Sequence, residues 1–242
     1  MHILAIETTG PYCSAAVING DAEVVEITSE QTLSHLQSLT VMIGDVLQEA
    51  GTTLKDLAAI AVSEGPGSFT GVRIGVSTAR GISQVLGTKL IAVPTLEAFG
   101  TYESSLIGDE KTLVCPVFDA RRHQVYAAGC TGTEETVKGG PYMIDEFLGM
   151  LSGYDRISFV GDGVKNYGDI IRGWAETCGK SIEMDERTQH AAGVAQLGLR
   201  LFRKGEFKEY NDLVPNYMRK AEAERKLDAK KAAAAVQAEA EK

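Results

Sequence analysis

One stretch decides how this chain folds, and its sequence is Ser63-Glu64-Gly65-Pro66-Gly67-Ser68-Phe69-Thr70-Gly71-Val72-Arg73-Ile74-Gly75-Val76-Ser77-Thr78-Ala79-Arg80-Gly81. The apolar run 57–62 before it predicts a buried strand, and the periodic segment after it predicts a helix. The residues from Gly65 to Gly71 therefore form a strand-to-helix turn, with Thr70 expected as the N-cap. A turn of this kind can bind an anion or let two elements approach closely.

The turn lacks two phosphate-binding motifs. A P-loop needs Lys followed by Ser or Thr where the helix begins, and this chain has Gly-Val-Arg at 71–73. The dinucleotide fingerprint has a different glycine spacing, and Pro66 has no backbone amide to offer a pyrophosphate. The predicted helix instead carries small residues four apart, which share one face and admit a neighbouring backbone. They are Gly71, Gly75, Ala79 and Ser83. That face packs either inside its own domain or against a partner, and the pattern leaves both open.

Composition is typical of a globular protein. Of the 242 residues, 44% are hydrophobic and 24% are charged, which suits one large domain or two small ones. No apolar run approaches the roughly 18 residues of a membrane span, and the N-terminus has no signal-peptide pattern. We therefore expect a cytoplasmic protein that binds no membrane.

The formal charge of −9 argues against this chain alone binding a polyanion. The four cysteines form no Cys-x-x-Cys pair and are expected to be reduced thiols.

Both halves of the chain show strand patterns followed by helix patterns. In the first half we expect strands at 2–6, 13–18 and 24–28, a helix at 34–50, and a strand at 89–93. In the second half the predicted strands are 113–118, 123–130 and 157–163, and the predicted helices are 164–177 and 191–203. This order suits a duplicated α/β plan with a boundary near residue 105.

Several groups of residues together resemble the bacterial TsaB family. They are Ile6-Glu7-Thr8-Thr9, the stretch 61–81, and Asp119-Ala120-Arg121-Arg122 with Val125-Tyr126. The family's Pro-x-Tyr-x-Arg ending is matched by Pro215, Tyr217 and Arg219. The resemblance is strong over residues 1–130 and weaker to residue 220.

The resemblance implies a fold and a domain plan. The fold is α/β, the actin-like (ribonuclease H-like) ATPase fold, with two related α/β subdomains of which the second is reduced. We expect an N-terminal subdomain at 1–105 that carries the partner helices and a reduced C-terminal subdomain at 106–219. The charged, Ala-rich tail at 220–242 is expected to be helical or disordered.

The resemblance also implies a function. TsaB resembles TsaD, the subunit that transfers a threonylcarbamoyl group from its adenylate to the adenosine 3′ of the tRNA anticodon, in bacteria together with the ATPase TsaE. This chain is expected to be a non-catalytic scaffold or activating subunit that dimerises with TsaD and meets TsaE in the ternary complex. It should meet tRNA through the complex and bind no cofactor alone, since ATP and a metal are used by the complex.

The catalytic paralogue holds its metal with a His-x-x-x-His pair after the strand equivalent to 89–93. The aligned residues here are Thr95 and Phe99, so both imidazoles are replaced. A hydroxyl and a phenyl ring cannot hold a divalent ion in their place, and we expect no metal site.

In the actin-like architecture the turn after the first strand approaches nucleotide phosphates. The residues of a vestigial nucleotide site would be Glu7, Thr8, Thr9 and Ser14 in that turn, with Gly161, Asp162 and Gly163, which resemble the adenosine-side loop weakly. A second glycine-rich phosphate loop would lie at 119–123, where this chain has Arg121 and Arg122. We expect these arginines to form structural ion pairs or partner contacts rather than to bind an anion. Weak residual nucleotide binding or ATPase activity stays open.

The helices at 34–50 and 71–86 are expected to form the partner surface, because each has more apolar or small surface than one face against its own sheet requires. The residues predicted there are Leu36, Leu39, Met42, Ile43, Val46, Val72, Gly75, Val76, Ala79 and Ile82. With matching helices of TsaD they would form a four-helix bundle. The same surface could pair with a second copy of the chain and give a homodimer.

Two alternative functions need residues that this sequence largely lacks. A stand-alone actin-like ATPase or sugar kinase needs an acidic residue and two glycine-rich phosphate loops, and the chain offers Glu7 and at most one such loop. A metallopeptidase needs a metal, and the four histidines, His2, His35, His123 and His190, have no ligand spacing.

Overall fold

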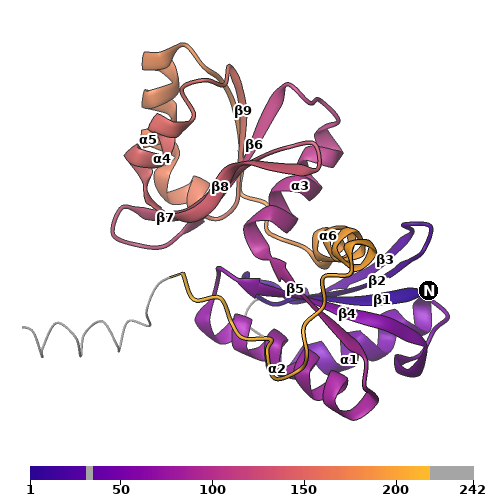
Figure 1. The fold of residues 1–242 in the computed structure, drawn as a ribbon. Coiled ribbons are helices and arrows are strands. Elements are labelled where there is room, and N and C mark those ends of the chain that lie inside the picture. The colour runs from indigo at the N-terminus through magenta and orange to yellow at the C-terminus, as the bar shows by residue number, and fades with distance from the viewer. Residues whose placement is uncertain (31–34, 219–242) are drawn as a thin grey trace, which may run out of the picture.

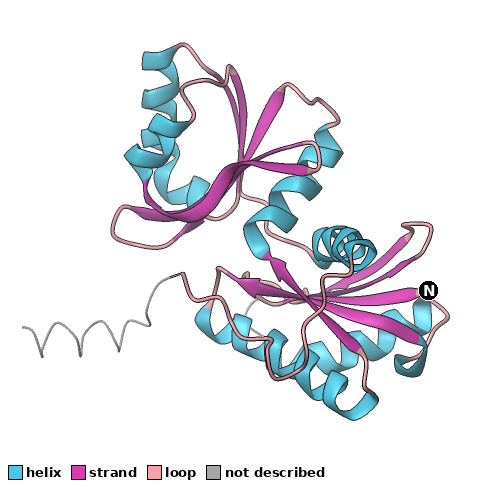
Figure 2. Cartoon of the chain, viewed as in Figure 1, coloured by secondary structure: helices cyan, strands magenta, loops and turns pink. Residues whose placement is uncertain are grey.

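The computed structural model describes residues 1–30 and 35–218 and places them in two α/β units (Figure 1). The expected tail at 220–242 and Arg219 lie outside the described residues. The strands and helices are connected by short loops (Figure 2). The elements predicted from the sequence are present, and the structure adds strands at 134–143 and 181–185 and a helix at 144–150 that the sequence patterns did not predict.

The first run of elements, here called repeat I, contains five strands and three α-helices. They are β1 His2–Glu7, β2 Ser14–Asn19, β3 Val24–Thr28, α1 His35–Glu49, β4 Leu57–Gly65, α2 Phe69–Leu86, β5 Lys89–Pro94 and α3 Thr95–Ile107. A single 3₁₀ turn, Leu54–Asp56, precedes β4.

The second run, repeat II, has the same elements in the same order. They are β6 Thr112–Asp119, β7 Gln124–Thr131, β8 Glu134–Met143, α4 Ile144–Met150, β9 Arg156–Val160, α5 Gly163–Cys178, β10 Ser181–Asp185 and α6 Ala191–Lys204. The strand orders also correspond, β3-β2-β1-β4-β5 in one sheet and β8-β7-β6-β9-β10 in the other. In both sheets the first three strands pair antiparallel and the last two join in parallel. The predicted pair of related α/β subdomains is confirmed, and the expected reduction of the second is seen in α4, which has 7 residues where α1 has 15, and in β9, which has 5 residues where β4 has 9.

The last helix of each repeat packs on the sheet of the other repeat. Helix α3 contacts β6 and β7, whereas α6 contacts β1 and β2, and the two helices also contact each other. Figure 1 shows α3 and α6 between the two sheets, with α1 and α2 on the far face of the first sheet and α4 and α5 on the far face of the second. The sequence analysis places most of α3 in the range 1–105 and all of α6 in the range 106–219, and the structure packs each helix on the sheet formed by the other range. Helical periodicity shows that a face is buried but not which sheet buries it.

Alternation along the central strands explains this layering. Along β1, Leu4 and Ile6 belong to the core beneath α1 and α2, whereas Ile3 and Ala5 belong to the core beneath α6. Both faces of the strand are therefore apolar, as expected for a strand covered by helices on two sides.

Helix α2 lies close to its own sheet. Its N-cap is Ser68, whose hydroxyl accepts a hydrogen bond from the amide of Gly71, so the predicted cap at Thr70 is wrong by two residues. A Cβ on Gly71 would overlap the carbonyl oxygen of Thr8, and one on Gly75 would overlap the Thr8 hydroxyl. The small face of α2 thus serves close packing inside repeat I.

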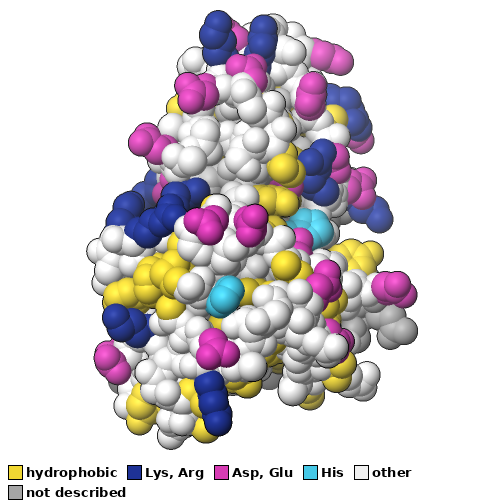
Figure 3. Space-filling view, turned by 90° about the vertical axis from the view of Figure 1, so that its right-hand side faces the viewer, with side chains coloured by type: hydrophobic (Ala, Val, Ile, Leu, Met, Phe, Trp, Pro, Cys, Tyr) yellow, Lys and Arg dark blue, Asp and Glu magenta, His cyan; other side chains and the backbone are white. Residues whose placement is uncertain are grey.

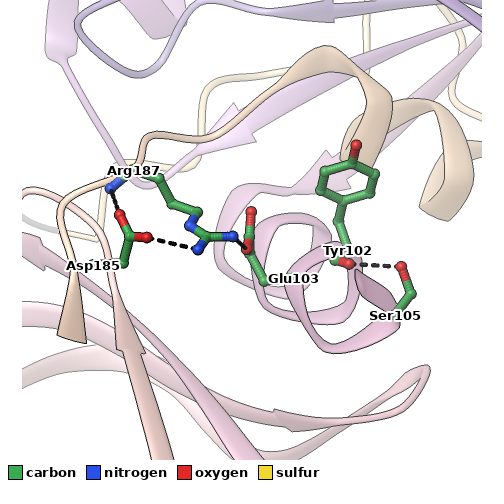
Figure 4. Close-up of polar contacts among 5 residues, drawn as sticks. All are labelled: Tyr102, Glu103, Ser105, Asp185 and Arg187. Carbon is green, nitrogen blue, oxygen red and sulfur yellow. Dashed lines mark hydrogen bonds and ion pairs between the residues drawn. The ribbon is translucent and has the colours of Figure 1, made fainter. Parts of the chain in front are cut away.

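A crossing segment, residues 186–190, leads from β10 back to α6. Arg187 fastens it, because its guanidinium donates to Glu103 Oε2 of α3 at 2.7 Å and to Asp185 Oδ2 at 2.6 Å (Figure 4). Burial raises the pKa of Glu103, and the charge of Arg187 acts in the opposite direction. Tyr102 and Ser105 of the same helix point away from this ion pair (Figure 4).

After α6 a strap, residues 205–218, runs along repeat I. The amide of Lys208 donates to the carbonyl oxygen of Leu90, and the amide of Asn216 donates to that of Glu64. Leu213 is buried in the core beneath α1 and α2, and Met218 packs against the cluster formed by α3 and the second sheet. The strap therefore touches both units.

The exposed surface mixes both charges. On the face drawn in Figure 3, acidic side chains are scattered, and lysine and arginine side chains lie at its upper end and on both its left and right sides. Within the described ranges, no helix has both the length and the apolarity needed to cross a bilayer. Cys13, Cys115 and Cys130 are buried free thiols and Cys178 is an exposed one, as expected.

Candidate functional site

A cleft of about 620 Å³ opens between the two units. Its walls come from the β1–β2 turn, the β4–α2 turn, the β6–β7 turn, the start of α5, the crossing segment and the strap. The residues lining it include Thr9, Gly10, Ser68, Phe69, Asp119, Arg121, Asp162, Gln189 and Tyr217. The carboxyl ends of β1, β4 and β6 meet here, which is where sheets of this kind place their sites.

The acid of the β1–β2 turn is enclosed by the protein. Glu7 is fully buried, its Oε1 accepts a hydrogen bond from the amide of Thr9, and its Oε2 accepts one from the hydroxyl of Ser63. Burial raises the pKa of this carboxyl, although both hydrogen bonds favour the charged form. The Thr8 hydroxyl donates to the carbonyl oxygen of Gly71 at 2.8 Å. These two predicted residues thus fasten β1 to β4 and α2 and do not line the cleft.

Gln189 fills the concave side of the same turn. Its Nε2 donates to the Thr9 hydroxyl at 3.0 Å, and a Cβ on Gly10 would lie 2.7 Å from its side-chain carbon. The Ser14 hydroxyl accepts a hydrogen bond from the amide of Ala191, the first residue of α6. Of the four residues predicted in this turn, only Thr9 lines the cleft. Gln189 was missed, because no local pattern connects it to a turn 180 residues earlier.

The predicted segment 161–163 does reach the cleft, through Asp162. Gly161 has a φ of 116°, and its amide donates to the carbonyl oxygen of Asp185. A Cβ on Gly163 would lie 2.7 Å from the carbonyl oxygen of Val117, so this glycine lets α5 approach β6. Asp162 Oδ1 accepts a hydrogen bond from the amide of Asp119 at 3.0 Å. The structure therefore brings Thr9 and Asp162 into one cleft, with Gly161 and Gly163 positioning the second wall.

The β6–β7 turn presents arginines. Asp119 accepts hydrogen bonds from the amide of Arg121, from Asn166 and from the hydroxyl of Tyr167. Arg121, Arg122 and His123 all have a φ near 60°, at 62°, 59° and 59°. Their side chains are exposed, and the described residues place no carboxylate within ion-pair distance of either arginine. The predicted structural ion pairs are therefore absent from the part of the chain that the structure describes.

An aromatic pair stands at the opposite rim. The rings of Phe69 and Tyr217 stack with centroids 4.7 Å apart, and the guanidinium of Arg73 lies 4.0 Å from the Phe69 centroid. Nε of Arg73 donates to the Tyr217 hydroxyl at 2.7 Å. Both rings remain more than one third exposed.

Thr95 and Phe99, the positions aligned with metal ligands, are both buried. The Thr95 hydroxyl accepts a hydrogen bond from the amide of Gly65, and the ring of Phe99 stacks on Phe118. Both side chains serve the packing of α3. Residues 1–30 and 35–218 contain no group of three or more His, Cys, Asp or Glu side chains placed to hold a metal.

Most of the predicted partner surface is buried in repeat I. Eight of the ten residues belong to the core beneath α1 and α2, namely Leu39, Met42, Ile43, Val46, Val72, Gly75, Val76 and Ala79, and Ile82 is half-buried against it. Leu36 alone is well exposed. These small and apolar residues are used where α1 packs on β2 and β3 and where α2 packs on β4 and β1.

The exposed faces of α1 and α2 form a different surface. A groove of about 370 Å³ runs between these helices, lined by Thr40, Gly44, Leu47, Ser77, Gly81 and Ile82, among others. Leu36, Val41 and Val85 are the exposed large apolar side chains of the two helices, apart from Phe69 at the cleft rim. A Cβ on Gly44 or Gly81 would meet nothing within 4 Å.

Comparisons with known proteins agree with one another. A family model described as TsaD, tRNA N6-adenosine threonylcarbamoyltransferase, matches residues 24–227. The tRNA threonylcarbamoyladenosine biosynthesis protein TsaB of Bacillus subtilis is 31% identical over 235 residues, which cover 93% of this chain and 97% of that protein. TsaB of Escherichia coli is 34% identical over 161 residues, which cover 63% of this chain and 68% of that protein.

Two solved structures have the same fold. YeaZ from Pseudomonas aeruginosa gives a TM-score of 0.71 at 25% identity, over 89% of this chain and 99% of that one. A Pseudomonas aeruginosa protein described as similar to peptidase YeaZ gives a TM-score of 0.73 at 24% identity, over 90% and 99%. With the two corresponding sheets, these matches confirm the expected actin-like α/β fold.

Proposed function

Because this chain belongs to the TsaB family of tRNA threonylcarbamoyladenosine biosynthesis, we propose that it is the non-catalytic, activating partner of TsaD. In this proposal TsaD transfers the threonylcarbamoyl group to the adenosine 3′ of the anticodon, and the ATPase TsaE joins the two in a ternary complex. The complex works in the cytoplasm and uses ATP and a metal, which this chain does not bind alone.

The proposal rests on the structural roles of Thr95 and Phe99, the residues aligned with the metal ligands of the paralogue. The Thr95 hydroxyl holds the end of β4, and the Phe99 ring is packed against Phe118. Neither side chain offers an imidazole, so a catalytic metal has to come from the paralogue.

The β1–β2 turn also favours a non-catalytic role. Glu7 is enclosed, and Gln189 fills the space beside Thr9, which leaves little room for a phosphate group. A stand-alone ATPase or sugar kinase also needs a second glycine-rich phosphate turn, and that position has Arg121 and Arg122. Neither turn favours the alternative.

For the partner surface we propose the groove between α1 and α2. Gly44, Ser77 and Gly81 keep it open, and the exposed Leu36, Val41 and Val85 provide apolar contacts at its sides. A pair of helices from TsaD that enters this groove would complete a four-helix bundle. The matching pair of a second copy would give a homodimer when TsaD is absent.

Reconstitution tests the function. Purified TsaD, TsaE, ATP, threonylcarbamoyl-adenylate and unmodified tRNA are combined with and without this chain, and the modified nucleoside is measured by mass spectrometry. We expect modification only when TsaD and this chain are both present. Modification by this chain without TsaD, or equal modification by TsaD without it, would show the proposal to be wrong.

A pair of glycine variants tests the surface. Gly81→Trp fills the groove while the backbone around it has room, so the monomer should fold and bind TsaD at least tenfold more weakly. Gly173→Trp fills the groove between α4 and α5 of repeat II, where a Cβ also meets nothing within 4 Å, and is the matched control. Light scattering after size exclusion, alone and with TsaD, measures both assemblies, and circular dichroism checks the fold. Unchanged assembly of Gly81→Trp would exclude this groove.

A further inference from the structure

The two arginines of the β6–β7 turn have no ion-pair partner among the described residues. Arg156, Arg172 and Arg187, by contrast, each pair with a carboxylate within 3.2 Å. An exposed guanidinium without a carboxylate keeps its full capacity to bind an anion, and its planar fork suits a phosphate.

The backbone of this turn is held firmly. The amide of Arg121 donates to Asp119 Oδ1 at 2.6 Å, and the amide of Gln124 donates to the carbonyl oxygen of Arg121. The carbonyl oxygen of His123 accepts a hydrogen bond from the amide of Ile144, the first residue of α4. Both arginines are thus presented on a fixed backbone, which reduces the entropy lost when their side chains bind.

The opposite rim offers flat surfaces. Phe69, Arg73 and Tyr217 form a stacked group, and the two rings are 38% and 39% exposed. Phe69, Tyr217 and Arg121 line the same cleft. Exposed aromatic and guanidinium planes are the surfaces on which unpaired bases stack in RNA complexes.

Carboxylates lie in the same cleft. Asp119, which is half-buried, and Asp162, which is exposed, line it, and both repel a phosphate that comes close to them. This mixture of charges suits an extended ligand, whose phosphates contact the arginines and whose planar groups contact the aromatic rings, better than a compact phosphate held beside the carboxylates.

From this arrangement we infer that a rim of the cleft, formed by Phe69, Arg121 and Tyr217 together with the adjoining Arg73 and Arg122, binds a single-stranded segment of the RNA substrate inside the complex. The inference rests on the proposed function, which supplies the RNA. The net charge of −9 explains why the contact needs the complex, since so few arginines cannot hold a polyanion against the field of the whole chain.

The test measures tRNA binding to the complex of TsaD and this chain at several salt concentrations. Each phosphate contact to a single strand adds roughly 0.7 to the slope of log K against log salt. For Arg121→Gln/Arg122→Gln we expect about tenfold weaker binding and a slope smaller by about 1.4, the sum of two such contacts. Tyr217→Leu should weaken binding about fivefold with an unchanged slope, because stacking releases no counterions.

The matched control is Arg156→Gln/Arg172→Gln, which changes the net charge equally at two arginines that are already paired. It should bind tRNA like the wild type. Unchanged affinity and slope in the Arg121→Gln/Arg122→Gln variant, with normal modification by TsaD, would overturn the inference and leave the proposed function intact. Weaker assembly with TsaD in that variant would also overturn it, because the rim would then face protein. A wild-type chain that does not activate TsaD would overturn both.

Discussion

Glu7 and Asp119 end the first strands of the two repeats, at corresponding places in the topology, but the protein uses them differently. Glu7 is fully buried and bonded to Thr9 and Ser63. Asp119 is half-buried at the cleft, where it orders the Arg121 backbone and accepts hydrogen bonds from Asn166 and Tyr167. The turn after β1 connects elements inside repeat I through buried hydrogen bonds, whereas the turn after β6 presents Arg121 and Arg122 to solvent. Equal topology therefore does not imply equal function.

The entries to α2 and α5 show what the repeats have kept. Gly71 lies against the carbonyl oxygen of Thr8, and Gly163 lies against that of Val117. In each repeat a helix begins directly over the end of the first strand, and only glycine allows the approach. The repeats thus share their packing rule and differ in the side chains around it.

The largest expected effect tests that shared rule. Gly71→Ala forces a Cβ into backbone atoms, and we expect a loss of about 3 kcal/mol in the free energy of unfolding, at the upper end of overpacking costs. Gly163→Ala meets Val117 at 2.7 Å and should cost about 2 kcal/mol. Gly81→Ala, in the middle of α2 with open space around it, should gain up to about 1 kcal/mol. Urea unfolding ranks the three, and equal stability of the first two with the wild type would remove the close approach as an explanation.

The second prediction concerns the connection between the repeats. Strand β5 passes directly into α3, whereas β10 reaches α6 through the crossing segment that Arg187 fastens. Arg187→Met leaves the buried carboxylate of Glu103 without its partner, and we expect a loss of about 2 kcal/mol at neutral pH. Because burial raises the pKa of Glu103, the loss should shrink in acid, where the carboxyl is protonated.

The matched control for that variant is the double change Arg187→Met/Glu103→Gln, which removes both charges and should recover most of the stability. Chemical unfolding at neutral and acidic pH measures the three proteins. If the double variant is as unstable as the single one, the charge of Glu103 is not the cause.

The third prediction uses the buried acid of repeat I. Because burial raises the folded-state pKa of Glu7 above its ordinary value near 4.5, the folded state binds more protons than the unfolded state above that pH. Stability should then fall as pH rises from 4.5 to the folded pKa, by about 1.4 kcal/mol for each unit of difference. Glu7→Gln has no such titration, so its stability relative to the wild type should improve over this window. A difference between the two proteins that does not change with pH would show that Glu7 titrates normally.

Many of the strands and helices could be predicted from the sequence. The placement of helices on sheets and the contacts between the repeats depend on residues far apart in the chain. In repeat I the order of strands and helices follows from period-2 and helical patterns, and the residues from Gly65 to Gly71 predict the strand-to-helix turn. In repeat II the patterns do not predict β8, α4 and β10. The exchange of α3 and α6 could not be predicted, because an apolar helix face fits either sheet. Ala79 was assigned to a partner surface because small residues serve a sheet and a neighbouring helix equally well. Gln189 and the Arg187 fastening depend on pairs 84 to 180 residues apart, which no local pattern reveals.

The smallest expected effect concerns the strap, which follows α6 along repeat I and, within residues 1–30 and 35–218, has no counterpart on repeat II. Tyr217→Phe keeps the ring on Phe69 and removes only the hydrogen bond from Arg73, an exposed contact, so we expect a loss of at most about 0.5 kcal/mol. Tyr217→Ala also removes the stack and should cost about 1 kcal/mol. Both variants should keep a cooperative urea transition, because Leu213 and the Asn216 amide still anchor the strap. A loss of several kcal/mol in either one would mean that this part of the strap contributes to the core of repeat I, although both rings are more than one third exposed.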